Sequence, residues 1–355
     1  MVGCVALAAG DAFVWFTHQP VSTAWLKREI AATRPDLRFA FSRPGLTTFK
    51  IDPAVTAEPI SSFARAHGRS LGRATNVDDV LAHAATLPAA PLMRLHVFER
   101  DPDRPADERD AAIAGTRATA LDAAIRAAAP GRFADGVEAA AGDLVLDVIV
   151  APAEEPEDGM FVGWHRHDAT RGPFPGGVAH VAIPAHVPSR AWAKIEEAIR
   201  WSGLVPKPGE VAIEIGSAPG GASLALLERG LHVHGVDPGA MDPRVLAYVG
   251  PGGNTFKHHA VPAAEVAKKD LPTTYEWLAS DVNLAPMIAL RYVERFVALA
   301  HGGLKGAFIT LKLNDDGVFE ALPRLATRIA KLGAARVRYT QLPSHRSEIV
   351  AILEW

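Results

Sequence analysis

The chain has 355 residues, of which 48% are apolar and 22% charged, and its formal net charge is −3. This is ordinary globular composition, and the length predicts two or three domains. The single cysteine excludes an internal disulfide framework and favours a reducing compartment, which we expect to be the cytoplasm. No apolar run approaches the ~20 residues that span a bilayer, so we expect no membrane partner. The first 13 residues lack a basic region and are predicted to form a strand rather than a signal peptide.

Residues 1–75 are predicted to form a small α+β unit. Strands are expected at 13–17, 37–41 and 47–51, and a helix at 22–33 with Ser22 as its N-cap. The turn Arg43-Pro44-Gly45 separates the last two strands. Basic residues predominate in this part and near the C-terminus, whereas acidic residues gather in the middle of the chain. This distribution is compatible with RNA binding and equally with an ordinary solvated surface.

A second unit is predicted at residues 76–170. Its expected elements are helices at 77–86 and 111–129, strands at 93–99, 143–150 and 159–164, a charged loop at 102–109 and an acidic turn at 153–158. Residues 171–188 are rich in proline and glycine, which predicts a linker, with one further strand expected at 178–183.

The segment 189–355 is predicted to be an α/β domain. Its strands are near-continuous apolar runs at 211–215, 231–236, 277–279, 306–313 and 349–353. Such runs are typical of a parallel sheet that is covered on both faces.

A glycine-rich turn follows the first of these strands and precedes a helical pattern at 222–229. It consists of Gly216, Ser217, Ala218, Pro219, Gly220 and Gly221. Glycine allows close approach of the backbone to a ligand, and Asp237, after the next apolar run, can accept hydrogen bonds from ribose hydroxyls. The spacing is neither that of a dinucleotide site nor that of a phosphate-binding loop. It predicts a Rossmann-like nucleoside site, most simply for S-adenosylmethionine; the alternative is a glycine turn without a ligand.

Four ionisable residues lie at the ends of predicted elements of this domain: Lys194, on a helix ahead of the first strand, and Asp281, Lys312 and Glu348. Ligands of open α/β sheets bind outside the carboxyl ends of the strands, so Asp281 and Lys312 should share a crevice with the glycine turn. Lys194 could alternatively be surface charge paired with Glu196 or Glu197, and Lys312 could belong to a purely structural buried ion pair.

The ordered segments SRAWAKIEE, EIGSAPGG, VDPGAMD, SDVNLAP, ITLKLN and RSEIVAI resemble the FtsJ-like ribose 2′-O-methyltransferases. The resemblance implies that Lys194, Asp281, Lys312 and Glu348 form a catalytic Lys-Asp-Lys-Glu tetrad. It also implies S-adenosylmethionine as cofactor, bound by the turn at 216–221, Asp237 and Asp281. Residues 161–198 are similar to the linker and entry helix of the bacterial enzymes that methylate a cytidine of large-subunit rRNA.

This likeness implies a Rossmann-like methyltransferase sheet at 189–355, preceded by a ferredoxin-like unit at 1–75, a THUMP-like RNA-binding unit at 76–170 and a linker at 171–188. The expected partner is 23S rRNA, and we expect a monomer. The chain departs from the family pattern in carrying Glu214, where aspartate is usual, and in lacking an acidic residue after the third strand that would bind adenine. Backbone groups or Asn254 are the candidates to replace that acid.

The tetrad suggests a mechanism in which Lys312 accepts the proton of a ribose 2′-hydroxyl. Burial and the neighbouring Lys194 are expected to lower its pKa from ~10.4 towards neutrality. Asp281 would orient Lys312, Lys194 would stabilise the developing oxyanion, and Glu348 would orient Lys194. Two alternatives remain: a non-catalytic RNA-binding or ribosome-assembly factor, and a methyltransferase for a non-RNA hydroxyl. Histidine pairs such as His165 and His167 lack a third ligand with zinc spacing, so the sequence predicts no metal site.

Overall fold

A computed structural model of the chain describes residues 13–88, 90–101, 115–152, 159–313 and 316–355. It forms two compact units, residues 1–179 and 180–355. The strand predicted at the N-terminus, the charged loop at 102–109 and the acidic turn at 153–158 fall largely or entirely outside the described residues. Within the described ranges, no helix has both the length and the apolar character needed to cross a bilayer.

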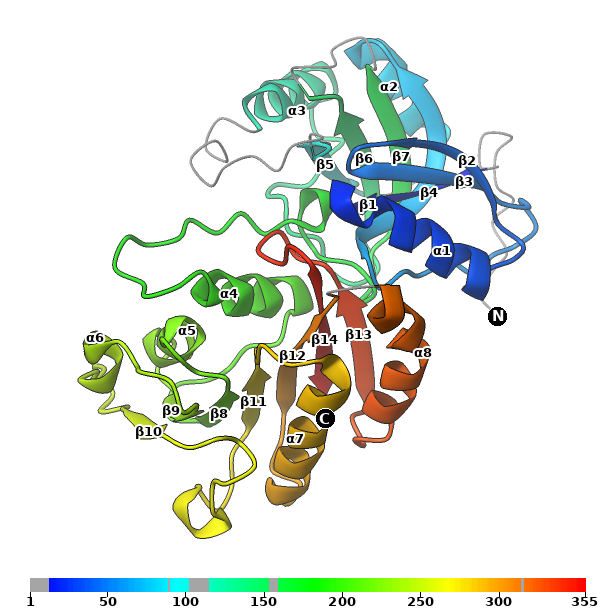
Figure 1. The fold of residues 1–355 in the computed structure, drawn as a ribbon. Helices are drawn as coiled ribbons and strands as arrows, with labels where there is room; N and C mark the ends of the chain where they lie inside the picture. The colour runs from blue at the N-terminus through cyan, green and yellow to red at the C-terminus, as the bar shows by residue number, and fades with distance from the viewer. Residues whose placement is uncertain (1–12, 89, 102–114, 153–158, 314–315) are drawn as a thin grey trace. The chain divides into compact units, whose positions relative to one another are not determined.

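The described residues of the first unit form one curved sheet with strand order β2-β3-β1-β4-β7-β6-β5 (Figure 1). Its elements are β1 (Phe13–His18), α1 (Thr23–Thr33), β2 (Arg38–Arg43), β3 (Leu46–Lys50), β4 (Ala64–Ala74), α2 (Val77–Ala85), β5 (Arg94–Glu99), α3 (Thr116–Ala128), β6 (Leu144–Val150) and β7 (Met160–Arg166). Strands β5 and β6 are parallel, whereas the other neighbours are antiparallel. Helices α2 and α3 cover one face through a core that includes Leu95, Leu146 and Val148.

Most elements predicted for this unit are confirmed, and the differences have local causes. Ser22 is the N-cap of α1, but its hydroxyl makes no capping hydrogen bond, whereas Asn76 caps α2 by accepting from the Asp79 amide at 2.9 Å. The prediction of a strand at 178–183 is wrong, because these residues have no regular secondary structure. Strand β4 pairs with both β1 and β7, so one sheet runs through both predicted N-terminal units. Their finer division at residue 75 stays a prediction.

The second unit is an α/β layered domain, as predicted. Its elements are α4 (Ala191–Ser202), β8 (Val211–Ile215), α5 (Gly221–Glu228), β9 (His232–Val236), α6 (Pro243–Leu246), β10 (Phe256–His259), β11 (Trp277–Ser280), α7 (Pro286–Leu299), β12 (Gly306–Lys312), α8 (Asp316–Ala330), β13 (Arg336–Thr340) and β14 (Glu348–Glu354). The strand order is β10-β9-β8-β11-β12-β14-β13. The five strands from β10 to β12 are parallel, and β14 lies antiparallel between β12 and β13.

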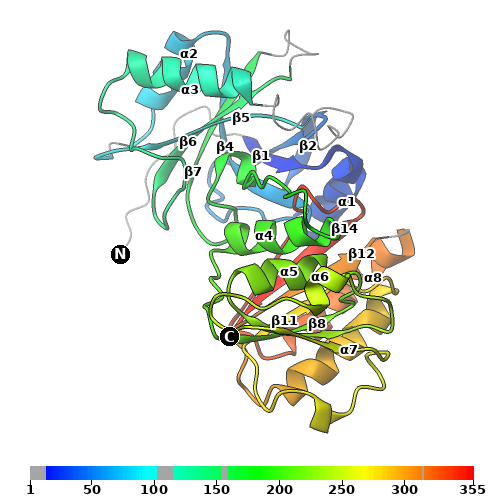
Figure 2. The same ribbon diagram turned by 90° about the vertical axis from the view of Figure 1, so that its left-hand side faces the viewer.

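Helices cover both faces of this second sheet, with α4 and α5 on one face and α7 on the other (Figure 2). The core under α4 and α5 includes Trp201, Ala279 and Phe308; burying a large apolar side chain contributes roughly 1.5–3 kcal/mol. Helix α4 ends at Gly203, whose φ of 70° suits a left-handed cap, and α7 begins with Pro286, where the missing N–H costs no helix bond.

The chain leaves β8 towards β9 on one side, while β11 lies on the other side of β8. This reversal is the topological switch point at which open α/β sheets bind ligands, outside the carboxyl ends of their strands. The fold therefore places the end of β8, with the glycine turn, at the position where a ligand is expected.

Candidate active site in the second unit

The glycine turn joins β8 to α5 and packs against the neighbouring loop. Gly216 has a φ of 84°, and a Cβ added there would lie 2.7 Å from the backbone oxygen of Asp281. Gly221 is equally confined, because an added Cβ would lie 2.1 Å from Oγ of Ser189, just before α4. These two glycines let the turn touch both the strand that carries Asp281 and the entry to the helix that carries Lys194.

Asp237 follows β9 at the same edge of the sheet. Its carboxylate accepts from the backbone N–H groups of Gly239 at 2.6 Å and Ala218 at 3.3 Å. These bonds fix the carboxylate against the glycine turn. A carboxylate oxygen can accept more than one hydrogen bond, so acceptor capacity remains for the hydroxyls of a ribose.

Lys194, Asp281, Lys312 and Glu348 are brought together and form a closed ring of alternating charge. Nζ of Lys194 lies 2.8 Å from Oδ2 of Asp281 and 2.5 Å from Oε2 of Glu348. Nζ of Lys312 lies 3.0 Å from Oδ1 of Asp281 and also contacts Oε1 of Glu348. Each carboxylate therefore bridges both ammonium groups. The side chains remain 13–17% exposed, so the ring is accessible from solvent.

The strand register explains why residues so far apart in sequence meet. Strand β11 pairs in parallel with β8, so Asp281, one residue past β11, lies next to Gly216. Lys312 and Glu348 are direct partners across the antiparallel pair β12 and β14. Lys194 reaches the ring from the N-terminal half of α4. Pairing with Glu196 or Glu197 is excluded, because Glu196 binds Arg229 and Glu197 binds Ser344.

The lysines stabilise the ionised form of both carboxylates in the ring. Burial alone would raise the pKa of Asp281, but Lys194 and Lys312 outweigh it and hold that pKa below its ordinary value. Glu348 behaves in the same way: burial raises its pKa, whereas hydrogen bonds from the two lysines lower it further than burial raises it. Both carboxylates are therefore charged at neutral pH.

The expectation that the ring lowers the pKa of Lys312 is wrong for the protein without ligands. Burial does lower it, but Asp281 and Glu348 outweigh burial and raise the pKa above its ordinary value. The physical reason is that both carboxylates of the ring lie between the two lysines. Their negative charges stabilise the protonated form of Lys312 more than Lys194 destabilises it. Lys312 is therefore a protonated lysine in the unliganded ring.

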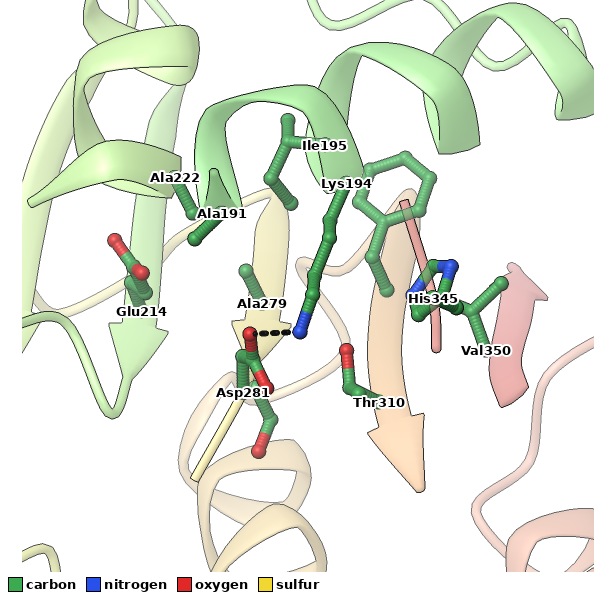
Figure 3. Close-up of a pocket in the computed structure, with 12 residues that line it drawn as sticks. Ala191, Lys194, Ile195, Glu214, Ala222, Ala279, Asp281, Thr310, His345 and Val350 are labelled. Atoms are coloured by element: carbon green, nitrogen blue, oxygen red, sulfur yellow. Dashed lines mark hydrogen bonds and ion pairs between the residues drawn. The ribbon is translucent and has the colours of Figure 1, made fainter. Parts of the chain in front are cut away.

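A small pocket with a cavity volume of about 10 Å³ adjoins the ring (Figure 3). Its wall includes Lys194 and Ile195 of α4, Asp281 after β11, and Thr310 of β12. Figure 3 shows the Lys194 side chain extending from α4 to Asp281 across this space. The pocket thus combines an apolar wall with a few convergent polar groups, which is the usual character of a small-molecule site.

The family model of the FtsJ-like methyltransferases matches residues 187–291, which hold α4, the glycine turn, Asp237 and Asp281. The second unit contains an FtsJ-like methyltransferase domain. The curated relatives include the ribosomal RNA large subunit methyltransferase M of Chromohalobacter salexigens, 30% identical over 185 residues and 49% of each chain. The protein of the same name from Halorhodospira halophila is 32% identical over 181 residues and 50% of each chain. The match spans about half the length of these relatives.

The similar solved structures include TrmN from Thermus thermophilus, with a TM-score of 0.33, 14% identity and coverage of 96% of this chain and 99% of that one. Another is the magnesium protoporphyrin IX methyltransferase from Synechocystis, with a TM-score of 0.32, 17% identity and coverage of 46% and 78%. Scores this low support no argument about function, and the fold rests on the strand order described above.

Glu214 of the FtsJ-like domain is fully buried at the end of β8 and hydrogen bonds to Ser223 of α5. Burial raises the pKa of Glu214 to about 8. The hydrogen bond with Ser223 lowers this pKa, whereas the negative charges of Asp281 and Asp237 raise it. Glu214 is therefore neutral at pH 7 and lies in the pocket wall as a hydrogen-bonding carboxylic acid.

Asn254 is excluded as an adenine-binding residue of the FtsJ-like domain. Its buried amide donates to the carbonyls of Leu227 and Leu231, each at 2.9 Å. Leu231 precedes β9, so this amide lies at the amino end of the strand, away from Asp237. Backbone groups are the remaining candidates from the sequence analysis for holding the adenine.

Two contributors to the ring were missed in the sequence. His345 is buried in the pocket wall, and burial lowers its pKa to about 4, with Lys194 acting in the same direction. Glu197, one turn along α4 from Lys194, accepts from the backbone N–H of Ser344 at 2.9 Å and from its hydroxyl at 2.7 Å. The available signal was their spacing: His345 and Glu197 each lie three residues from a tetrad member.

Proposed function

We propose that this protein is an S-adenosylmethionine-dependent ribose 2′-O-methyltransferase that acts on structured RNA, with a cytidine of 23S rRNA as its target. The observation that carries the proposal is the closed ring of Lys194, Asp281, Lys312 and Glu348 beside the glycine turn of an FtsJ-like domain. A glycine turn alone fits many nucleoside-binding enzymes. Two lysines held by two carboxylates at the same edge of the sheet fit proton removal from a hydroxyl.

The residues at the carboxyl edge suit the cofactor. Asp237 supplies a carboxylate for the ribose hydroxyls, and the turn at 216–221 with Asp281 lies directly beside it. When bound, S-adenosylmethionine supplies a methyl group activated by a positively charged sulfonium.

Each ring residue then has a chemical role. Lys312 accepts the proton of the 2′-hydroxyl, for which its ammonium must first lose a proton; a positive charge brought near the ring lowers the pKa of that ammonium. Lys194 donates a hydrogen bond to the oxygen as negative charge develops on it. Asp281 and Glu348 orient both amines, since each carboxylate contacts both lysines.

The choice of substrate rests on the relatives. Both curated proteins described above are named as methyltransferases of the ribosomal large subunit, and residues of the first unit would contribute a THUMP-like surface for that RNA. The expected location is the cytoplasm, where rRNA is assembled, and a monomer stays the prediction for the active form.

Mass-spectrometric mapping of ribose methylation in 23S rRNA tests the proposal. Cells that lack the gene should lose one 2′-O-methylcytidine, and the wild-type gene should restore it. A gene carrying Lys312→Ala should fail to restore the mark, although the variant protein accumulates and binds S-adenosylhomocysteine. An unchanged methylation map in the deletion strain would contradict the proposed substrate. Full restoration by Lys312→Ala would contradict the proposed role of the ring.

A further inference from the structure

A second cluster of ionisable side chains lies in the first unit. His96 of β5, Asp147 of β6 and His165 of β7 each place one nitrogen or carboxylate oxygen within 4.8 Å of the other two. The three strands are neighbours in the sheet (Figure 1). In the part of the chain that the structure describes, this is the one group of three or more such residues that could hold a metal ion.

Strand register places these side chains on one face of the sheet. His96 is the direct partner of Asp147 in the parallel pair β5 and β6. His165 is the partner of Val145, two residues from Asp147 on the same strand. Side chains of paired residues, and of residues two apart, point to the same face. That face is opposite to the one covered by α2 and α3, whose core contains the intervening residues Leu146 and Val148.

The geometry within the cluster leaves acceptors facing one another. Nδ1 of His165 lies 2.6 Å from Oδ2 of Asp147. Nε2 of His96 donates to the carbonyl of Val137 at 2.7 Å, so Nδ1 of the neutral ring carries the lone pair. That Nδ1 lies 3.7 Å from Oδ1 of Asp147, too far for a hydrogen bond. The Nδ1 atom of His96 and Oδ1 of Asp147 thus flank a gap that no hydrogen bond spans.

Burial makes these facing acceptors costly unless a cation joins them. His96, Asp147 and His165 are each at most 1% exposed. Oδ1 of Asp147 has no hydrogen-bond partner, and an unsatisfied buried polar group costs about 1–3 kcal/mol. The nearby buried Arg171 is already matched by Glu58 and, at 3.6 Å, by Asp168. Arg171 therefore forms its ion pairs with Glu58 and Asp168 rather than with Asp147.

We propose that His96, Asp147 and His165 bind a divalent transition-metal ion, zinc in the first instance, with His167 as a fourth ligand after its side chain shifts toward the cluster. Two imidazoles and a carboxylate are a donor set that zinc accepts in tetrahedral geometry. The His167 ring lies 5.7 Å from that of His165, and its Nδ1 is buried without a hydrogen-bond partner. The bond from His96 to the Val137 carbonyl is the kind of outer contact that orients a metal-binding histidine.

The ligand atoms of His96, Asp147 and His165, which lie within 4.8 Å of one another, must move closer together to bind one ion. Ligand atoms about 2.0–2.1 Å from a tetrahedral zinc lie about 3.3 Å from one another. The present separations are 2.6 Å from Oδ2 of Asp147 to His165 and 3.7 Å from Oδ1 of Asp147 to His96, on either side of that value. The ion would hold together three strands of the first unit and so stabilise that unit, because ligands that bind the folded state alone raise its stability.

The test uses the full-length, tag-free protein. Its zinc, iron, manganese and nickel contents are measured by mass spectrometry after purification without chelator. Chelator-treated protein is then titrated with Zn²⁺ by calorimetry and with Co²⁺ by visible absorption. We expect about one ion per chain, a raised melting temperature on adding Zn²⁺, and at least about 100-fold weaker binding by Asp147→Asn, since even outer contacts to a metal site are worth about 10–100-fold.

The matched control is His234→Asn in the second unit. His234 and His259 form a histidine pair with 3.0 Å between their nitrogens but without a carboxylate, so this variant should bind the ion like the wild type. The proposal is overturned if chelator-treated wild-type protein takes up neither ion at micromolar concentration. It is equally overturned if Asp147→Asn and His96→Gln bind as tightly as the wild type. The wild-type titration decides the question even if a variant fails to fold.

Discussion

Replacing Glu348 by glutamine should shift the pH dependence of methyl transfer to lower pH. The carboxylate of Glu348 contacts Nζ of Lys194 at 2.5 Å and also contacts Nζ of Lys312. Its charge favours the protonated form of Lys312, whose pKa lies above the ordinary value. Glutamine keeps the size and one oxygen of the side chain but removes the negative charge. The ring then carries a net positive charge, which makes a proton easier to remove from Lys312.

The size of the shift follows from the contact. Unit charges about 4 Å apart attract by about 4 kcal/mol at an effective dielectric constant of about 20, which corresponds to about three pKa units. The ring side chains are 13–17% exposed, so solvent weakens this interaction. We therefore expect the rising limb of the rate profile, which reports deprotonation of the base, to move down by about 1–2 units.

The assay is single-turnover methyl transfer to unmethylated 23S rRNA, measured from pH 6 to pH 10 in the wild type and in Glu348→Gln. The control is Glu354→Gln on the same strand, because Glu354 pairs with Arg336 and makes no contact with the ring. The control should keep the wild-type profile. A rising limb in Glu348→Gln that stays in place, or moves to higher pH, would refute the assignment of Lys312 as the base.

Three further outcomes are expected. Lys312→Ala should lower the rate of transfer by about 10²–10⁴-fold while calorimetry shows unchanged binding of S-adenosylhomocysteine; unchanged turnover would contradict the proposed role. Gly216→Ala should abolish cofactor binding in the same assay, because its Cβ would meet the Asp281 backbone, whereas Gly209→Ala, at a φ of 85° with nothing within 4 Å, should lose only about 1–2 kcal/mol of stability. Burial raises the pKa of Glu214 from 4.5 to about 8, so the folded chain keeps a proton that the unfolded chain releases, and stability should fall as pH rises through this range. Glu214→Gln should remove that part of the pH dependence of urea unfolding, and a slope identical to that of the wild type would contradict it.

The α/β fold of the second unit could be predicted because its strands are short apolar runs with a distinctive turn between the first strand and its helix. Strand β4 of the first unit was missed for the opposite reason. Its sequence, ARAHGRSLGRA, contains charged residues and glycines that disfavour a strand on propensity. The fold nevertheless buries Arg65, His67 and Arg69 within it. Tertiary pairing with β1 and β7 thus overrides the local preference.

The membership of the ring could be predicted, but its charge arrangement could not. The order of motifs indicates which residues belong together, since the carboxyl ends of parallel strands meet at one edge. The alternation of lysine and carboxylate depends on side-chain directions set by β14, whose antiparallel insertion no single segment reveals. The same holds for His96, Asp147 and His165, which come from three strands and show no ligand spacing in the sequence.

Because β14 is inserted antiparallel into the sheet, the ring forms only when the neighbouring strands are correctly aligned. Lys312 and Glu348 meet only because β14 pairs with β12 in one register, and a slip of one residue would turn Glu348 to the opposite face. Ser344, four residues before Glu348, is held by Glu197 on the helix that also carries Lys194. Helix α4 therefore supplies Lys194 to the ring and also holds the segment that leads to Glu348. A one-residue shift of β14 against β12 would therefore separate Glu348 from Lys312 and open the ring.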